Sequence, residues 1–151
     1  MEKRNNSILV ALNDSVSSRA LVEYLAQMSL CPDDWDIDLL HFFRKPSSSE
    51  ELMGKKFAAD QPAKMTAMLE KAKEKLVENR FNPEKINVDL VNEPYESIAE
   101  GIIDQAQKRG SSMVIIGRKK MSKAEEFVMG DISVKVIRAL DGAAVLVVKS
   151  K

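Results

Sequence analysis

The chain of 151 residues has a single cysteine, Cys31, and a single histidine, His41. One cysteine excludes an internal disulfide, and this usage suits a reducing compartment, so we expect a cytoplasmic protein. A histidine without cysteine or acidic residues at ligand spacing argues against a metal site. Because no nucleophile stands in a recognisable relation to His41, the sequence also argues against a hydrolase triad.

The chain has no excess charge and no long hydrophobic run. Lysine plus arginine and aspartate plus glutamate number 23 each, so the net charge is zero. Nucleic-acid binding rests on an excess of positive charge, so we expect no nucleic-acid partner. The first apolar run, Ile8–Leu12, is too short for a signal-peptide core, and no run reaches transmembrane length. We therefore expect no membrane partner.

Short apolar runs alternate with segments of helical periodicity. The predicted strands are Ile8–Leu12, Ile37–Phe43, Ile86–Leu90, Met113–Ile116 and Val145–Val148. The first predicted helix carries Leu21, Leu25 and Met28 on one face and is ended by Pro32. The second covers Ala63–Asn79, and the third is opened by Asn92–Pro94 and closed by a C-cap at Gly110. The fourth covers Gly130–Leu140. Proline, serine and glycine predict a loop over Lys45–Gln61, with one helical turn around Glu50–Met53.

This order of elements predicts the fold class. Five strands that alternate with four helices imply right-handed crossovers and a mostly parallel sheet covered on both faces. The chain is long enough to bury a core of its own, and it contains no internal repeat. We therefore expect an α/β, doubly wound protein in which residues 1–151 form a single domain.

The last third of the chain joins a strand, a glycine, a basic loop, a second glycine and a helix. The first glycine is Gly117, the second is Gly130, and the loop between them carries several lysines. A strand that leads through a glycine loop into a helix is typical of phosphate sites. Backbone N–H groups and the positive helix N-terminus face the anion there.

Three strings together resemble the universal stress protein family. They are SILVALNDS near the start, DLLHFF in the second strand, and SMVIIGRKK followed by VMGDISVKVIRALDGAAVLVVK at the end. The resemblance covers essentially the whole chain. It implies a five-stranded sheet in the order 3-2-1-4-5 and a homodimer paired through the last strand. One branch of the family binds ATP and another does not.

The ATP-binding branch has the pattern Gly, two residues, Gly, nine residues, Gly and then Ser or Thr. That frame falls on Gly117, Lys120, Gly130 and Asp131, and Ser133 keeps a hydroxyl nearby. Lysine at the second glycine position restores a side chain where the backbone approaches phosphate. Asp131 replaces a hydroxyl by a carboxylate, and a like-charge contact at about 4 Å costs on the order of 4 kcal/mol at an effective dielectric near 20. Asp131 is interpreted more simply as a helix cap.

The resemblance also suggests a base pocket at the end of the first strand. Asn13 stands at the adenine-facing position, where nucleotide-binding members carry an acidic residue, and Leu12 and the backbone near Phe42 would line the pocket. An amide can still donate and accept hydrogen bonds, so this change is the weaker departure. We expect the Phe42 side chain itself to pack in the core.

Two functions are left open by these departures. The first is a non-enzymatic, dimeric stress-response protein with a degenerate nucleotide site and unidentified regulatory partners. The second is a regulator that binds ATP or AMP through Leu12, Asn13, Gly117, Gly130 and Ser133, with at most slow hydrolysis. No catalytic constellation supports a dedicated enzyme. The strand Val145–Val148 is apolar on both sides and unprotected by charge, which favours homodimerisation through it.

Overall fold

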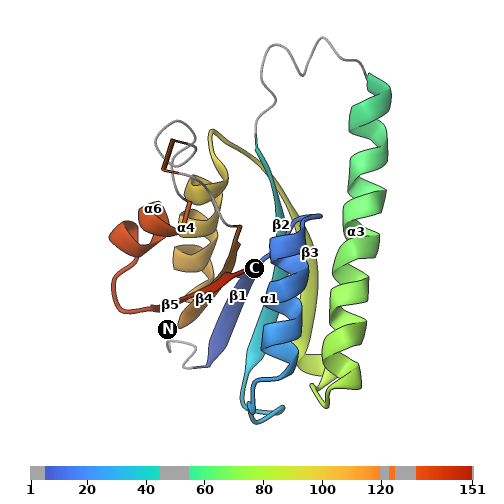
Figure 1. The fold of residues 1–151 in the computed structure, drawn as a ribbon, viewed down its shortest axis with the longest axis vertical. Coiled ribbons are helices and arrows are strands. Elements are labelled where there is room, and N and C mark those ends of the chain that lie inside the picture. The colour runs from blue at the N-terminus through green and yellow to red at the C-terminus, as the bar shows by residue number, and fades with distance from the viewer. Residues whose placement is uncertain (1–5, 45–54, 120–122, 125–131, 151) are drawn as a thin grey trace.

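The structure is a computed structural model that describes residues 6–44, 55–119, 123–124 and 132–150 (Figure 1). Its five strands form one sheet in the order β3-β2-β1-β4-β5, with parallel neighbours throughout. The strands are β1 (Ser7–Ala11), β2 (Asp36–Arg44), β3 (Ile86–Tyr95), β4 (Met113–Arg118) and β5 (Ala144–Lys149). This sheet confirms the predicted doubly wound fold and strand order.

Helices cover both faces of the sheet (Figure 1). One face carries α1 (Val16–Ala26) and α3 (Lys55–Glu78), and the other carries α4 (Ile98–Arg109) and α6 (Ile132–Ala139). A short 3-10 helix, η1 (Pro83–Lys85), precedes β3. The arrangement follows from the right-handed crossovers that join parallel strands.

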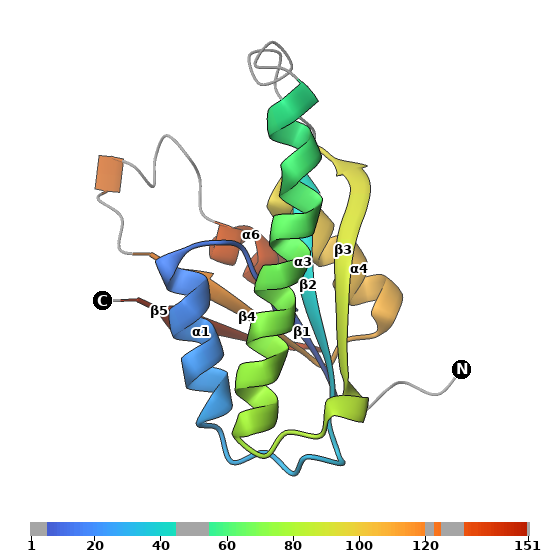
Figure 2. The same cartoon turned by 90° about the vertical axis from the view of Figure 1, so that its right-hand side faces the viewer.

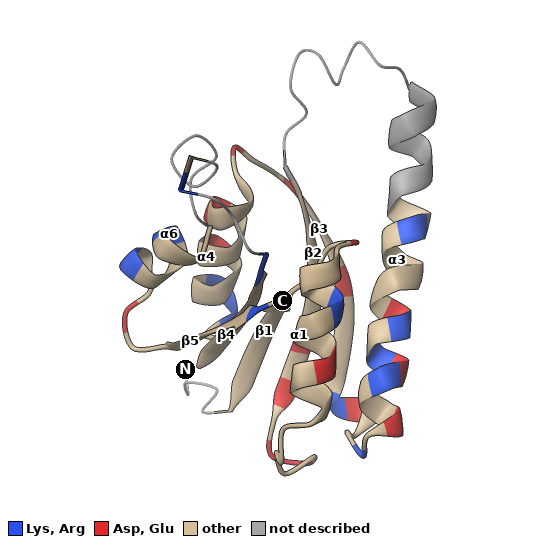
Figure 3. Cartoon of the chain, viewed as in Figure 1, with Lys and Arg blue, Asp and Glu red and all other residues tan. Residues whose placement is uncertain are grey.

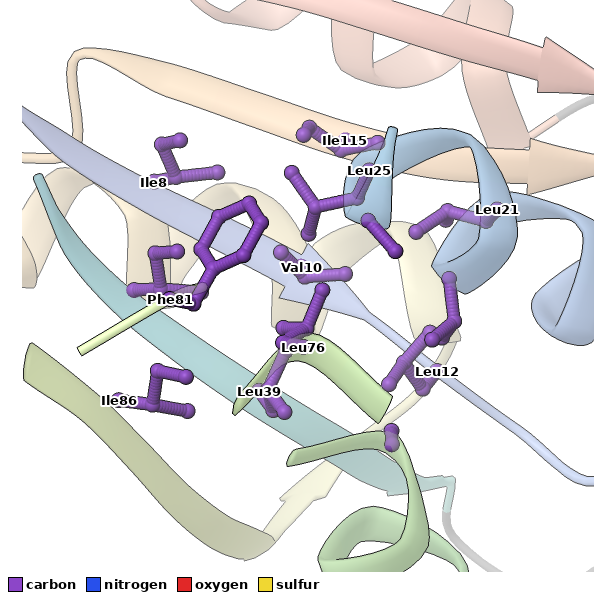
Figure 4. Close-up of a cluster of buried hydrophobic side chains, with 14 of the residues drawn as sticks. Ile8, Val10, Leu12, Leu21, Leu25, Leu39, Leu76, Phe81, Ile86 and Ile115 are labelled. Atoms are coloured by element: carbon purple, nitrogen blue, oxygen red, sulfur yellow. The ribbon is translucent and has the colours of Figure 1, made fainter. Parts of the chain in front are cut away.

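The central strand β1 lies inside the core on both sides. Ile8, Leu9 and Val10 are all 0% exposed. Ile8 and Val10 pack under α1 and α3, in the cluster that Figure 4 shows, whereas Leu9 joins the cluster under α4 and α6. A strand buried on both faces reads as a continuous apolar run, which is why the sequence identified it.

Serine and glycine set the helix ends. Ser15 caps α1 by accepting a hydrogen bond from the Ser18 N–H, and Ser97 does the same for α4 through the Glu100 N–H. Gly110 closes α4 in the left-handed conformation, with φ 62° and ψ 39°, as predicted. Such a conformation is strained for residues with a Cβ atom, so glycine is the residue expected there.

Three boundaries predicted from prolines were wrong. Helix α1, predicted to include Met28 and to be ended by Pro32, already ends at Ala26. Helix α3 begins at Lys55 and continues through Pro62, so residues 55–61 are helical rather than part of a loop. A proline removes one backbone hydrogen bond, and the alanines and lysines around it favour helix strongly enough to continue. Residues 45–54, with the predicted turn at Glu50–Met53, lie outside the described part of the chain.

The third misplaced boundary is the start of α4. Asn92–Pro94, predicted to open this helix, belongs to β3, and α4 starts only at Ile98. Because β3 is an edge strand, Pro94 can lack its N–H without breaking the interior of the sheet. For α6, Ile132–Ala139 agrees with the prediction, while Gly130 and Asp131 lie outside the described residues.

A polar cluster joins the edge strand β3 to α4. The Tyr95 hydroxyl lies 2.5 Å from Asp104 and 2.8 Å from Glu93, and the Lys108 ammonium lies 2.8 Å and 3.3 Å from the same two carboxylates. Burial, together with the hydrogen bond to Asp104, raises the pKa of Tyr95 to about 12. Hydrogen bonds to Asp104 and Glu93 raise the pKa of Lys108 to about 12. At neutral pH both groups therefore donate to carboxylates, whose pKa values are lowered in turn.

The opposite edge of the sheet is apolar. In β5 the four residues Val145–Val148 are half-buried, and α6 exposes Ile132, Val134 and Ile137 beside it. Apolar strand edges of this kind are free to pair with another chain. No helix among the described residues combines the length and apolarity needed to span a bilayer.

Candidate functional site

The carboxyl ends of β1 and β4 form the topological switch point of the sheet. The chain leaves β1 toward β2 on one side, and β4 pairs with β1 on the other. Open α/β sheets bind ligands in the crevice outside such a point. Here the crevice is a cavity of about 100 Å³, and Leu12, Asn13 and Gly117 are among its lining residues. The structure therefore brings three of the five predicted site residues together.

The Asn13 side chain is held by serine hydroxyls from the start of α1. Its Oδ1 accepts from Ser15 Oγ and, at 2.8 Å, from Ser18 Oγ, which itself accepts from the Asn13 N–H at 2.9 Å. The side-chain oxygen of Asn13 is therefore already engaged in hydrogen bonds within the protein. Among the described residues Nδ2 has no hydrogen-bond partner, so a ligand would meet an N–H donor where an acidic side chain would offer an acceptor.

Gly117 is required by the close approach of α1 to β4. A Cβ atom at this position would lie 2.7 Å from the Ser17 carbonyl oxygen and 3.0 Å from the Ser17 carbonyl carbon. Both atoms belong to the backbone, so a side-chain rotation cannot relieve the overlap. The first glycine of the predicted phosphate frame therefore has a packing role that needs no ligand.

Leu12 and Phe42, at which a base pocket was predicted, are both buried in the core. Leu12 is 3% exposed, and its N–H donates to the Leu40 carbonyl at 2.8 Å. Phe42 is 5% exposed and packs in the cluster beneath α4 and α6, as expected. Their side chains give the cavity apolar walls and leave it little depth.

His41 is a cavity residue that the sequence reasoning missed. Its Nδ1 donates to the Leu12 carbonyl at 2.8 Å, and its ring meets the Phe43 ring edge-on, with 4.7 Å between centroids. Burial lowers the pKa of His41, although the hydrogen bond to Leu12 acts in the opposite direction. The imidazole is therefore neutral at pH 7 and presents Nε2 as an acceptor. The one sequence feature that indicates a place in the cavity is the position of His41 toward the carboxyl end of the second predicted strand.

The remaining predicted residues come from the loop and α6. Ser133 is 4% exposed, and it is not among the described residues that line the cavity; its neighbour Ile132 is. Gly130, Lys120 and Asp131 lie outside the described residues, so the glycine frame is tested only at Gly117. Within the described ranges, no group of three or more histidine, cysteine or acidic side chains could hold a metal ion.

A second polar group contains a buried carboxylate. Asp38 in β2 is 2% exposed; Asn87 donates to its Oδ1 at 3.2 Å, and Arg109 lies 3.7 Å from Oδ2. Arg109 also contacts Asp89 at 3.4 Å, so it links α4 to β2 and β3. Buried charges are usually paired in this way, and we interpret the group as a structural tie between layers.

The family model for universal stress proteins matches residues 4–149. The chain belongs to the universal stress protein family. A search of curated proteins found no match. Solved structures of the family share the fold of this universal stress protein at low sequence identity. A family member from Burkholderia pseudomallei is 15% identical, with a TM-score of 0.69 over 99% of this chain and 100% of the other.

Two further solved structures contain nucleotides. A universal stress protein in complex with cAMP is 14% identical, with a TM-score of 0.65 over 95% of each chain. A family protein from Arabidopsis thaliana with AMP bound is also 14% identical, with a TM-score of 0.62 over 97% of this chain and 92% of the other. At these identities the likeness establishes the common fold.

The first prediction concerns the packing role of Gly117. Changing Gly117 to Ala should lower the free energy of unfolding by about 1–3 kcal/mol, as overpacking does, because the new methyl group meets the Ser17 backbone. Urea denaturation measures the loss. The exposed neighbour Lys119→Ala is the control and should change stability by less than about 0.5 kcal/mol. Equal stability of Gly117→Ala and the wild type would contradict the packing role.

The second prediction concerns His41 and pH. Because the folded pKa is depressed, protons bind the unfolded state first, so stability should fall as pH drops below about 6.5. In His41→Asn the amide can still donate to the Leu12 carbonyl, but no imidazole titrates. The part of the stability loss at low pH that comes from His41 should therefore disappear. Urea unfolding of both proteins at pH 7.5 and 5.5 measures it. An identical loss in the two would show that His41 does not titrate differently on folding.

Proposed function

We propose that this protein is a non-enzymatic, dimeric universal stress protein that acts through regulatory protein contacts and not through a bound nucleotide. The observation that carries the proposal is the small size of the crevice at the switch point. Its volume of about 100 Å³ is below the roughly 300–1,000 Å³ typical of ligand pockets. The hydrogen bonds of Asn13 and the approach of Ser17 to Gly117 account for the residues there without a ligand.

The loop sequence supports the same function. Lys120 and Asp131 stand where the nucleotide-binding pattern has a glycine and a hydroxyl residue. A carboxylate in the first turn of a helix competes with phosphate for the same N–H groups and repels it. Neither His41, whose Nδ1 is engaged by Leu12, nor any described neighbour provides a nucleophile and base pair.

The second candidate is a regulator that binds ATP or AMP, with slow hydrolysis at most. It is favoured by the solved relatives described with cAMP and AMP. It is also favoured by the basic residues Arg118, Lys119, Lys120 and Lys123, which can contact phosphate. In this case Asn13 would donate from Nδ2 to an acceptor on the base.

The third prediction separates the two candidates. Titration of the purified protein with ATP and magnesium, followed by calorimetry, should give no saturable heat at micromolar concentrations. The double variant Lys120→Gly with Asp131→Ser restores the pattern and should gain affinity by at least about tenfold. Saturable micromolar binding by the wild type would overturn the first function in favour of the second. A double variant no better than the wild type would show that these two positions do not close the site.

The proposed dimer uses β5. This strand is the apolar edge of the sheet, and the half-buried Val145–Val148 would gain a hydrogen-bonded neighbour by pairing with a second copy. The exposed side chains of Val134 and Ile137 on α6 lie on the same side of the molecule and would add apolar contact area. Pairing of one edge with itself across a two-fold axis is an isologous contact.

The fourth prediction tests that edge. Val147→Asp should convert the dimer to monomers in sedimentation, because the carboxylate would be desolvated at the paired strand. Val77→Asp, on α3 and far from β5, is the matched control and should remain dimeric. Circular dichroism checks that both variants fold. An unchanged mass for folded Val147→Asp would count against pairing through β5.

A further inference from the structure

A second, larger hollow lies between α1 and α3, on the opposite face of the sheet from α4 and α6. The two helices contact each other, with α1 over β4 and β5 and α3 over β2 and β3 (Figure 2). The groove between them has a volume of about 580 Å³, within the roughly 300–1,000 Å³ of small-molecule sites. It is separate from the switch-point cavity, although Leu12, Asn13 and Ser18 contribute to both. None of the sites described above accounts for it.

Small side chains keep this groove open. Along α3 its wall repeats at helical spacing, through Lys64, Ala67, Met68, Lys71, Ala72 and Lys75. Ala67 and Ala72 leave space that larger residues would fill, and Ser18 does the same from α1. Open grooves that combine an apolar surface with a polar rim are typical of ligand-binding sites.

The floor of the groove is aliphatic. Leu12, Val22, Met68 and Ala72 supply it, and none of the described residues that line the groove is aromatic. A flat base would find nothing to stack on. A flexible hydrocarbon chain, by contrast, gains about 25 cal/mol for each Å² it buries against such a surface.

The rim of the groove is basic. Arg19 from α1 and Lys64, Lys71 and Lys75 from α3 outnumber the acidic Asp14 and Glu23, four to two. Lys64 pairs with Asp14 at 3.4 Å, whereas Lys71 and Lys75 form no ion pair with the described side chains. Figure 3 shows these charges on the facing helices α1 and α3. The groove thus joins an apolar floor to an excess of cations.

We propose that this groove binds a single-chain anionic amphiphile, a fatty carboxylate or a compound of the same chemistry. The hydrocarbon chain would lie on the aliphatic floor, and Arg19 or Lys71 would bind the anionic head. Lysine stems are apolar and can cover a buried chain while their ammonium groups reach water. The wall from Lys64 to Lys75 is about 16 Å long at 1.5 Å per residue. That length fits an extended chain of roughly a dozen carbons.

The lining argues against two other occupants. A nucleotide base would require a stacking surface, and no aromatic side chain stands among the described residues that line this groove. An acidic amphipathic helix from a partner protein would match the cations, but such a helix docks through a row of apolar anchors at i, i+3, i+4 and i+7, whereas only four aliphatic residues form this floor. A single hydrocarbon chain needs no more apolar surface than that floor provides.

The experiment is a calorimetric titration with dodecanoate below its micellar concentration. We expect saturable binding at one molecule per chain. Decanoate should bind about fifteenfold more weakly, at roughly fourfold for each methylene lost. Dodecanol, which has the chain without the charge, should bind at least about tenfold more weakly than dodecanoate. Absence of saturable dodecanoate binding, or equal binding of dodecanol, would overturn the proposal.

Two matched pairs of variants locate the site. Ala67→Trp fills the groove from an exposed position and should abolish binding, whereas Ala63→Trp, exposed on the same helix outside the groove, should not. Lys71→Glu should weaken binding at least about tenfold, and Lys73→Glu, two residues on and outside the lining, should leave it unchanged. Equal effects within either pair would place binding elsewhere and overturn the proposal.

Four further measurements exclude other sources of the signal. Excess ATP should not displace dodecanoate, since the groove lies apart from the switch point. Binding to anionic phospholipid vesicles without binding to free dodecanoate would assign the basic rim to a membrane surface and overturn the proposal. Binding of an acidic helical peptide without binding of dodecanoate would also overturn the proposal. If Ala67→Trp dissociated the dimer, the groove would be occupied by a second copy of the chain, and the proposal would be overturned.

Discussion

Complete burial of β1 on both faces is the constraint on which the rest of the structure depends. Ile8 and Val10 require a helical layer on one side of the sheet, and Leu9 requires another on the other side. A parallel strand in the middle of such a sandwich must be joined to its neighbours by helices. The chain leaves β1 at its carboxyl end, next to the end of β4, so the only crevice that the topology demands lies there.

In this protein the loop after β1 and the start of α1 line that crevice. The N-terminal turn of α1 approaches β4 closely enough to require Gly117, and its serines take up the Asn13 amide. The same loop forms one end of the groove between α1 and α3. One short segment therefore contributes to two hollows, the small cavity at the switch point and the larger groove between α1 and α3.

The strands could be predicted because four of them are compact apolar runs and β3 alternates apolar with polar residues, and neither pattern depends on neighbouring strands. Their order was predicted from the resemblance to the universal stress protein family. Prolines were misleading: Pro62 lies within a helix, and Pro94 lies in an edge strand, and neither context is visible locally. Asn13 and Gly117 could be placed at adjacent strand ends from the topology. The hydrogen bond of His41 to Leu12 and the space beside Ala67 could not, because both depend on side chains brought together only by the folded chain.

The two edges of the sheet differ in a way that limits how large an assembly can grow. Strand β3 carries Pro94 and the exposed acidic residues Asp89 and Glu93, and charges and proline both discourage strand addition. Strand β5 has neither along Val145–Val148. In the proposed dimer, pairing through β5 would use the apolar edge of each copy and would leave β3 outermost on both sides. Such an association would stop at two chains, because the edge that remains exposed disfavours further strand addition and therefore fibre formation.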